Sequence, residues 1–390
     1  MFEEYFQPLT TDVISHPESR QVADLLADKV SAYTSVGRFP DIEGIRIALF
    51  GVGEERGAID NDGCSRGADF IRRYFYQLKS HQQSVAFADF GNLRPGSTLD
   101  DTYAAIATVV SECLTAHVIP VILGGSQDLT YGHYLGYKKS EQIINIVSLD
   151  SLFDLGVPDG PTNNDNYMGR IILEQPNYLF NYGNLGYQTC FTGSESIALM
   201  KKLHFDAMRL GQVQTDILEA EPVIRSADML SVDISSVRMS DAPGHAQASP
   251  NGFYGEELCQ LMMYAGLSDK LTGLGLYEYN PEFDRQGQSA QLYAQALWYF
   301  FEGVSQRKAD LPMVNPNQYM TYRVAFEELE EEITFLKSLK SDRWWIKLPA
   351  DGSRNRYISQ HMLPCSYKDY QQACHNQVPE RWWNAVHKMV

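Results

Sequence analysis

The segment Ile143–Asp154 reads I-I-N-I-V-S-L-D-S-L-F-D and decides the fold class. Its apolar, β-branched first half is typical of a strand buried on both faces, as in parallel sheets. The run ends at Asp150, and a second carboxylate follows at Asp154. Because ligands and catalytic groups collect at the carboxyl ends of parallel strands, the two aspartates mark a candidate site. Buried carboxylates need a cation or hydrogen bonds. Leu152 between the two aspartates is therefore unexpected, because a metal site of this kind would have an imidazole at its position.

Apolar runs on either side of this segment predict further strands, and amphipathic stretches between them predict helices. The predicted strands are Ile45–Val52, Val118–Leu123, Tyr178–Tyr182, Met229–Ile234 and Leu274–Tyr279. The predicted helices are Gly67–Leu78, a helix from Asp100 or Asp101 to His117, Ser194–His204, Glu256–Ala265 and Gln291–Phe301. Strands that alternate with helices imply an α/β fold with a mainly parallel sheet and helices on both faces.

Composition narrows the class of protein. The chain has 390 residues, of which 44% are hydrophobic and 21% charged, so it can bury a large core. Its net charge of −17 argues against a nucleic acid or an anionic membrane as the main partner. No apolar run reaches the ~20 residues of a membrane helix. The N-terminus lacks the pattern of a signal peptide, and six cysteines without C-x-x-C spacing fit free thiols. We therefore expect a soluble cytoplasmic protein.

The C-terminal part has a different surface from the rest. Residues 1–300 carry a net charge of −18, whereas residues 301–390 carry +1. We predict a body domain over residues 1–304, with a lead-in over 1–40, and an extension over 305–390. The lead-in shows a short helical pattern at Val22–Val30.

Four of the five tryptophans lie in the last 50 residues, as the pairs Trp344-Trp345 and Trp382-Trp383. Paired tryptophans either hold the extension on the body or form a partner-binding surface. The stretch Val324–Lys340 has an apolar stripe that is typical of an amphipathic helix packed on a core, or of a partner groove.

Four strand-end motifs, in order, resemble those of the arginase, agmatinase and formimidoylglutamase (ureohydrolase) family. They are Gly124-Gly125-Ser126-Gln127-Asp128, Asp150-Ser151-Leu152-Phe153-Asp154, Ser231-Val232-Asp233-Ile234-Ser235 with Ala242-Pro243-Gly244, and Glu278-Tyr279-Asn280-Pro281. The sequence Tyr131-Gly132-His133-Tyr134 favours the formimidoylglutamase branch. The resemblance covers roughly residues 40–304 and implies a three-layer arginase-like fold with a mainly parallel central sheet, to which the extension is added.

The family holds two Mn²⁺ with two histidines and four aspartates, and a bridging hydroxide attacks the amidine or guanidine carbon. By this resemblance three ligands are retained, namely Asp150, Asp154 and Asp233. The three changed positions are Gln127 for the first histidine, Leu152 for the second histidine and Ser235 for the last aspartate. One metal position would keep three carboxylates and the Gln127 amide oxygen. The other would keep only the two bridging carboxylates.

We therefore expect no metal cofactor. The alternative is one Mn²⁺, Mg²⁺ or Ca²⁺ held by Asp150, Asp154, Asp233 and Gln127. Without a cation the carboxylates would repel one another, and at least one would hold a proton or an external hydrogen bond.

Two further side chains are catalytic candidates. The family uses the position of Glu278 to bind the planar cation of the substrate, and His133 could act as an acid or base. Each has a structural alternative: local hydrogen bonds for Glu278, and donation to a backbone carbonyl for His133.

The leading hypothesis is a formimidoylglutamase-like protein that has lost its binuclear manganese site and is catalytically inactive. It would act as an interaction or scaffold protein, as a homo-oligomer or with a protein partner bound by the extension. The alternative is an active C–N hydrolase of linear amidines or guanidines that uses a single cation. A third hypothesis is a small-molecule binder that uses the old pocket with Glu278 as the anchor.

Overall fold

A ten-stranded sheet runs through the body of the protein. The computed structural model describes residues 3–14, 23–80, 85–157, 160–312, 316–326, 332–349 and 361–389. The strands are β1 (Phe6–Gln7), β2 (Ser31–Ala32), β3 (Ile47–Val52), β4 (Phe87–Leu93), β5 (Ile119–Leu123), β6 (Ile144–Leu149), β7 (Leu179–Tyr187), β8 (Asp206–Arg209), β9 (Met229–Asp233) and β10 (Gly273–Tyr277). Their order is β1-β4-β3-β5-β10-β9-β6-β7-β8, with β2 beside β4. All pairs are parallel except β1 with β4.

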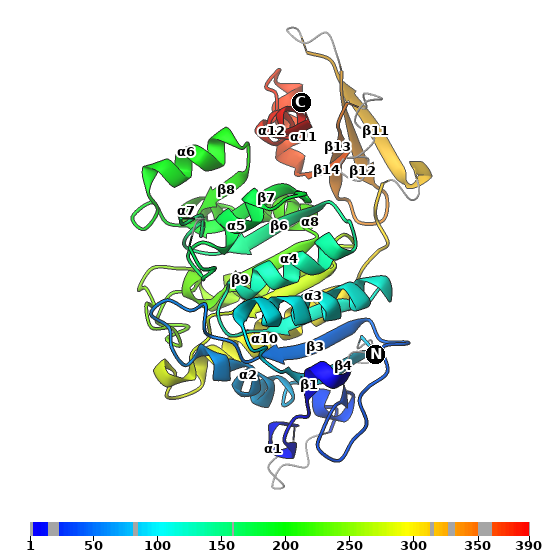
Figure 1. The fold of residues 1–390 in the computed structure, drawn as a ribbon. Coiled ribbons are helices and arrows are strands. Elements are labelled where there is room, and N and C mark those ends of the chain that lie inside the picture. Colours follow the sequence, from blue (N-terminus) through cyan, green and yellow to red (C-terminus); the bar gives the residue numbers. More distant parts are fainter. Residues whose placement is uncertain are drawn as a thin grey trace.

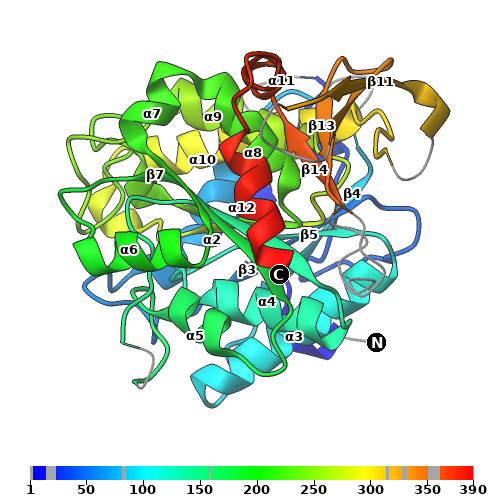
Figure 2. The ribbon, with the colours of Figure 1, turned by 90° about the horizontal axis from the view of Figure 1, so that it is seen from above.

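Helices cover both faces of this sheet (Figures 1 and 2). One layer contains α3 (Leu99–Thr115), α4 (Leu129–Lys139) and α5 (Tyr167–Leu173). The opposite layer contains α2 (Gly67–Phe75), α8 (Ala220–Ser226), α9 (Gly255–Leu267) and α10 (Gln288–Ser305). Shorter helices are α1 (Thr11–Ile14), α6 (Ser194–Lys202) and α7 (Leu210–Thr215). A separate apolar core fills each side of the sheet, which confirms the expected three-layer α/β fold.

The six predicted strands of this sheet are present, with shifted ends, and four strands were missed, namely β1, β2, β4 and β8. Every residue of β6 is buried, as its β-branched sequence predicts. The short strand expected at Tyr178–Tyr182 extends to Tyr187 as β7. The longest of the missed strands, β4, contains Asp89, which breaks the apolar pattern. Arg72 of α2 compensates this buried charge, because it donates one hydrogen bond to each carboxylate oxygen, at 2.8 and 3.0 Å.

Two helix predictions need correction, one at its N-cap and one over its whole length. Thr98, not Asp100 or Asp101, caps α3: its hydroxyl accepts from the N–H of Asp101, and the Asp101 carboxylate accepts from the N–H of Thr98. The helical pattern at Val22–Val30 yields only a 3-10 turn at Leu26–Asp28, and Val22 lies outside the described residues.

The extension contains a second sheet of four antiparallel strands, in the order β11 (Tyr319–Val324), β12 (Ile333–Ser338), β13 (Trp344–Lys347) and β14 (Met362–Cys365). Two helices follow, α11 (Tyr367–Cys374) and α12 (Glu380–Met389). The helix predicted over Val324–Lys340 is therefore wrong in the described residues. Ile333 and Phe335 alternate toward the core of the extension, because β12 pairs on both sides with other strands.

The extension packs on the body at α8 (Figure 1). Arg225 of α8 donates to the carbonyl oxygens of Trp344 at 3.1 and 3.2 Å and of Cys365 at 3.1 Å. Its guanidinium lies 4.4 Å from the ring centre of Trp345. The tryptophans at 344, 345 and 382 are buried, whereas Trp383 is 48% exposed. Three of the four C-terminal tryptophans therefore pack inward, and one is available to solvent.

The six cysteines are all free, as expected from their spacing. In the described ranges, no helix combines the length and apolar character needed to cross a membrane.

Candidate functional site

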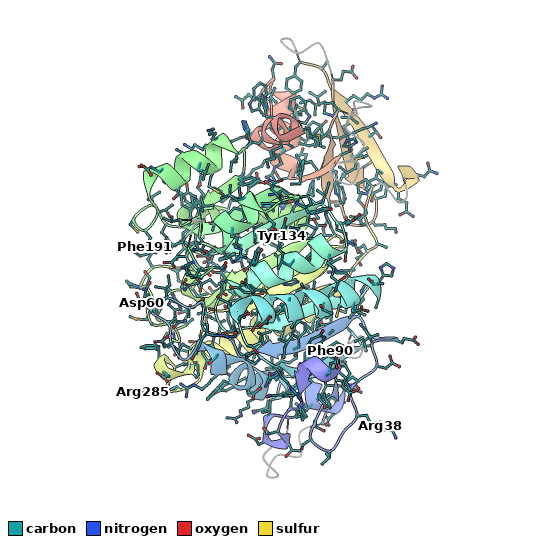
Figure 3. All side chains as sticks on the ribbon, in the orientation of Figure 1. Arg38, Asp60, Phe90, Tyr134, Phe191 and Arg285 are labelled. Atoms are coloured by element: carbon teal, nitrogen blue, oxygen red, sulfur yellow. The ribbon has the colours of Figure 1, made fainter. Side chains whose placement is uncertain are left out.

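The carboxyl ends of four neighbouring strands bring the candidate residues to one edge of the sheet. Gln127 follows β5, Asp150 follows β6, Asp233 ends β9 and Glu278 follows β10, in a sheet where these strands are adjacent. Figure 3 shows the same edge through Asp60, Phe191 and Arg285, which lie on loops after β3, β7 and β10. The candidate side chains are 1–8% exposed, so the site is buried beneath these loops.

The three aspartates accept few hydrogen bonds. Asp150 Oδ1 accepts from the N–H of Leu152 at 2.9 Å, and Asp233 Oδ1 accepts from the N–H of Ser235 at 2.7 Å. The Oδ2 atoms of Asp150 and Asp154 receive no hydrogen bond from any donor in the described residues. Asp154 also has a left-handed backbone, with φ of 51°, which side-chain-bearing residues seldom adopt.

Burial is the main reason why these carboxyl groups are difficult to ionise. It raises the pKa of Asp150 to about 6 and, with the nearby charge of Asp150, the pKa of Asp233 to about 8. The pKa of Asp154 is raised well above its usual value by burial and by the adjacent Asp150. Burial and the neighbouring carboxyl groups thus disfavour the ionised forms of these three side chains.

Gln127, Leu152 and Ser235 add little to the donor set. Gln127 Nε2 donates to Ser231 Oγ of β9 at 3.2 Å, so its amide nitrogen is already engaged within the protein. Leu152 has no ligating atom, and Ser235 is half-buried. Among the residues that the structure describes, no group of three or more His, Cys, Asp or Glu side chains is arranged to hold a metal ion.

Glu278 is held on both sides by other parts of the chain. Its Oε1 accepts from the N–H of Gln127 at 2.7 Å, and its Oε2 accepts from Asn61 Nδ2 at 2.7 Å. Asn61 comes from the glycine-rich loop after β3, and its Oδ1 accepts from the N–H of Ala246 and from Asn280 Nδ2. This fixes the direction of the Asn61 amide, so that its NH₂ group faces Glu278.

A histidine that the sequence reasoning missed, His245, also lies at this site. Its Nε2 is 3.7 Å from Glu278 Oε2, and its Nδ1 accepts from the N–H of Gln247 at 3.0 Å. Nδ1 is therefore unprotonated in the neutral ring, and Nε2 carries the proton toward Glu278. Burial would lower the pKa of His245, but Glu278 and Asp233 outweigh it and raise the pKa. The sequence feature that could have identified His245 is its position directly after the motif Ala242-Pro243-Gly244.

The structure does not bring His133 to the carboxylates. His133 lies on α4 against Gly273, at the first residue of β10 and thus at the opposite end of that strand from Glu278. Its ring stacks on Tyr137 at 5.9 Å between centroids. Neither ring nitrogen has a hydrogen-bond partner in the described residues, including the backbone carbonyl expected from the sequence. Burial lowers the pKa of His133 to about 3.

Known proteins resemble the chain over the body. The arginase family model matches residues 45–302. The formimidoylglutamase of Streptococcus gordonii is 25% identical over 277 residues, which cover 66% of this chain and 84% of that protein. The formimidoylglutamase of Salmonella typhi is 23% identical over 299 residues, which cover 74% and 93%.

Solved structures share the fold of the body. Formimidoylglutamase from Bacillus subtilis has a TM-score of 0.66 at 20% identity, covering 75% of this chain and 95% of its own. Formiminoglutamase from Trypanosoma cruzi, solved with Mn²⁺, has a TM-score of 0.63 at 19% identity, covering 70% and 97%.

Proposed function

Because the chain belongs to the arginase family, on its formimidoylglutamase-like branch, we propose that it has lost the binuclear manganese centre and with it hydrolysis. Its role is then that of an interaction or scaffold protein in the cytoplasm, and its free cysteines support that reducing compartment. The observation that carries the proposal is Leu152, which stands between Asp150 and Asp154 where the family places an imidazole.

The donor set does not fit a pair of Mn²⁺. One metal position retains only Asp150 and Asp233, which the family shares between both metals. A leucine supplies no lone pair, and the Ser235 hydroxyl is a weaker donor than a carboxylate. Activation of water in this family depends on two cations that polarise one oxygen, and this chain does not supply their ligands.

The retained Glu278 does not restore a substrate site by itself. Both of its oxygens accept hydrogen bonds from Gln127 and Asn61, and it is 1% exposed. A planar cation would have to compete with these internal donors. This arrangement supports the structural alternative for Glu278.

The test combines metal content with activity. The purified protein is incubated with excess Mn²⁺, freed of unbound metal by gel filtration and analysed by mass spectrometry for manganese. It is then incubated with N-formimidoyl-L-glutamate, and formamide is measured. We expect neither stoichiometric manganese nor formamide, while an active formimidoylglutamase treated in parallel gives both. Two manganese ions per chain together with formamide release would refute the proposal.

A second candidate function is C–N hydrolysis with a single cation. It is favoured by three buried carboxylates at adjacent strand ends, two of which have oxygens without a donor in the described residues. Titration with Mn²⁺, Mg²⁺ or Ca²⁺ should then raise the melting temperature of the wild type and have no effect on Asp233→Ala. If Asp233→Ala retains both a metal-induced shift and any measured activity, this candidate is removed.

The extension is the surface on which the interaction role depends. Its exposed Trp383 lies against His387, with 4.3 Å between the centroids of the two tilted rings, and offers an aromatic contact to a homo-oligomer or a protein partner. Sedimentation of the wild type and of Trp383→Ala tests self-association through this surface. A change in subunit number with the substitution supports self-association, and a monomer in both cases argues against it.

A further inference from the structure

A cavity of about 340 Å³ lies between the body and the extension. The body contributes the turns that precede β9 and β10, at the opposite edge of the sheet from Asp150. The extension contributes β13 and β14, and the segment after α10 closes one side. Its volume is in the range of small-molecule sites, which often lie at interfaces between domains. The arginase family match ends at residue 302, so this cavity exists only because the extension is present.

The walls of the cavity are mainly apolar. The apolar lining comes from Trp345 of β13, from Met362 and Pro364 of β14, and from Leu311 and Pro312. One face of the Trp345 ring is covered by Arg225, and Tyr319 meets it edge-on at 5.6 Å between centroids. The indole is therefore held in one orientation and is 2% exposed, so it forms a small, rigid part of the cavity wall.

The acidic side chains of the cavity are already covered by donors from the protein. Asp269 accepts two backbone N–H groups, from Ala309 at 3.1 Å and Asp310 at 2.8 Å. Asp310 in turn accepts three hydroxyl groups, which come from Tyr319, Ser338 and Ser341. The third acidic side chain, Asp228, pairs with Lys270 and accepts from the N–H of Asn145 at 2.7 Å. A cationic ligand would thus meet carboxylates whose oxygens are largely engaged.

The basic side chains retain donors. The ammonium of Lys270 has three N–H groups, and the described residues take two of them, at the Ser226 carbonyl and Asp228. Arg343 donates from Nη1 to the Leu267 carbonyl at 3.1 Å, and its Nε lies 3.3 Å from Glu221. Its Nη2 has no partner in the parts of the chain that the structure describes. Both side chains are less than one-fifth exposed, and such burial strengthens a charge-assisted hydrogen bond.

We infer that this cavity binds a small aromatic carboxylate, with its ring beside Trp345, Met362 and the two prolines and its carboxylate on Lys270 or Arg343. Because both the body and the extension form the walls, the bound molecule holds the two parts together. Binding of this ligand does not depend on whether the aspartate site holds a metal, because that site lies at the other edge of the sheet.

The test uses 2-naphthoate as the probe and 2-naphthamide as its neutral isostere, titrated calorimetrically into the full-length protein. We expect the wild type to bind 2-naphthoate at least tenfold more tightly than 2-naphthamide. Lys270→Met should weaken 2-naphthoate binding at least tenfold and leave 2-naphthamide nearly unchanged. Lys340→Met is the matched control, because Lys340 is an exposed lysine of the extension outside the cavity, and it should bind both probes like the wild type.

Lys270→Met also removes the ion pair with Asp228 and can therefore disturb the fold. A second variant gives an independent test of the site. Leu311→Trp fills the cavity with all charges in place, and it should abolish binding of both probes while circular dichroism remains native. Equal affinities for the two probes in the wild type would overturn the ligand class. No binding by the folded wild type, or undiminished binding by folded Leu311→Trp, would overturn the site.

Discussion

The backbone N–H of Gln127 donates to Glu278 Oε1 at 2.7 Å, joining the ends of β5 and β10. The bond uses the main chain, so it does not depend on which side chain stands at position 127. The ends of β5 and β10 are thus held in register at the candidate site. Under the ligand correspondence proposed above, this main-chain donor keeps the framework of the site whichever side chain stands at position 127.

The first prediction is that metal binding can be restored. The triple variant Gln127→His, Leu152→His and Ser235→Asp supplies the missing donors, while Asp150, Asp154 and Asp233 are already at their strand ends. We expect close to two Mn²⁺ per chain by mass spectrometry after gel filtration. The control replaces the same three residues by alanine, which opens space without adding ligands. If the two triple variants bind equally little manganese, the strand ends are not positioned as a ligand framework.

The second prediction concerns the buried ion pair of Arg72 and Asp89. Both side chains are fully buried, and Arg72 is the source of the two bonds to the carboxylate. Arg72→Met should lower the free energy of unfolding by about 3–5 kcal/mol, because it leaves a buried charge without its partner. The neighbouring Arg73 pairs with Asp12 on the surface, at 44% and 62% side-chain exposure. Arg73→Met should cost less than about 1 kcal/mol in the same urea titration. Similar losses in both variants would contradict the proposed role of burial.

The third prediction is a pH dependence of stability caused by His133. Burial lowers its pKa to about 3 in the folded protein, from an ordinary value near 6.5. Between these values the unfolded chain binds the proton more readily, so stability falls as the pH falls below about 6.5. His133→Leu removes this penalty. Relative to the wild type it should gain about 2 kcal/mol between pH 8 and pH 5.

Urea unfolding at the two pH values measures this difference, with the exposed His375→Gln as the control. A pH profile of His133→Leu that is parallel to the wild type would show that His133 is not a buried neutral group.

The sequence predicted those parts of the fold in which neighbouring residues carry the signal. The strand before Asp150 was predictable because all six of its residues are buried. β4 was not, because the partner that makes Asp89 acceptable, Arg72, is 17 residues earlier. His245 was missed for a similar reason, since it belongs to the site only through its contact with Glu278, which is distant in the sequence. In β12 the apolar spacing around Ile333 fits a helix as well as a strand, and only its pairing with β11 and β13 decides between them.

The fourth prediction is that Arg225 controls docking of the extension. Its guanidinium donates three hydrogen bonds to the carbonyl oxygens of Trp344 and Cys365, and these oxygens belong to adjacent strands of the extension. Arg225→Met would leave both carbonyls buried without a donor, at about 1–3 kcal/mol for each. The body keeps its own two cores, so local release of the extension should come before global unfolding.

Hydrogen exchange followed by mass spectrometry measures this release separately in the body and in the extension. In Arg225→Met, peptides of residues 332–349 and 361–389 should exchange at least tenfold faster, while those of β5, β6 and β9 are unchanged. Arg323→Gln is the control, because Arg323 is an exposed arginine on β11. Uniform acceleration across both parts would mean that Arg225 stabilises the whole protein. Unchanged exchange in the extension would mean that the ion pairs of Arg343 with Glu221 and Arg381 with Glu219 are sufficient to hold it.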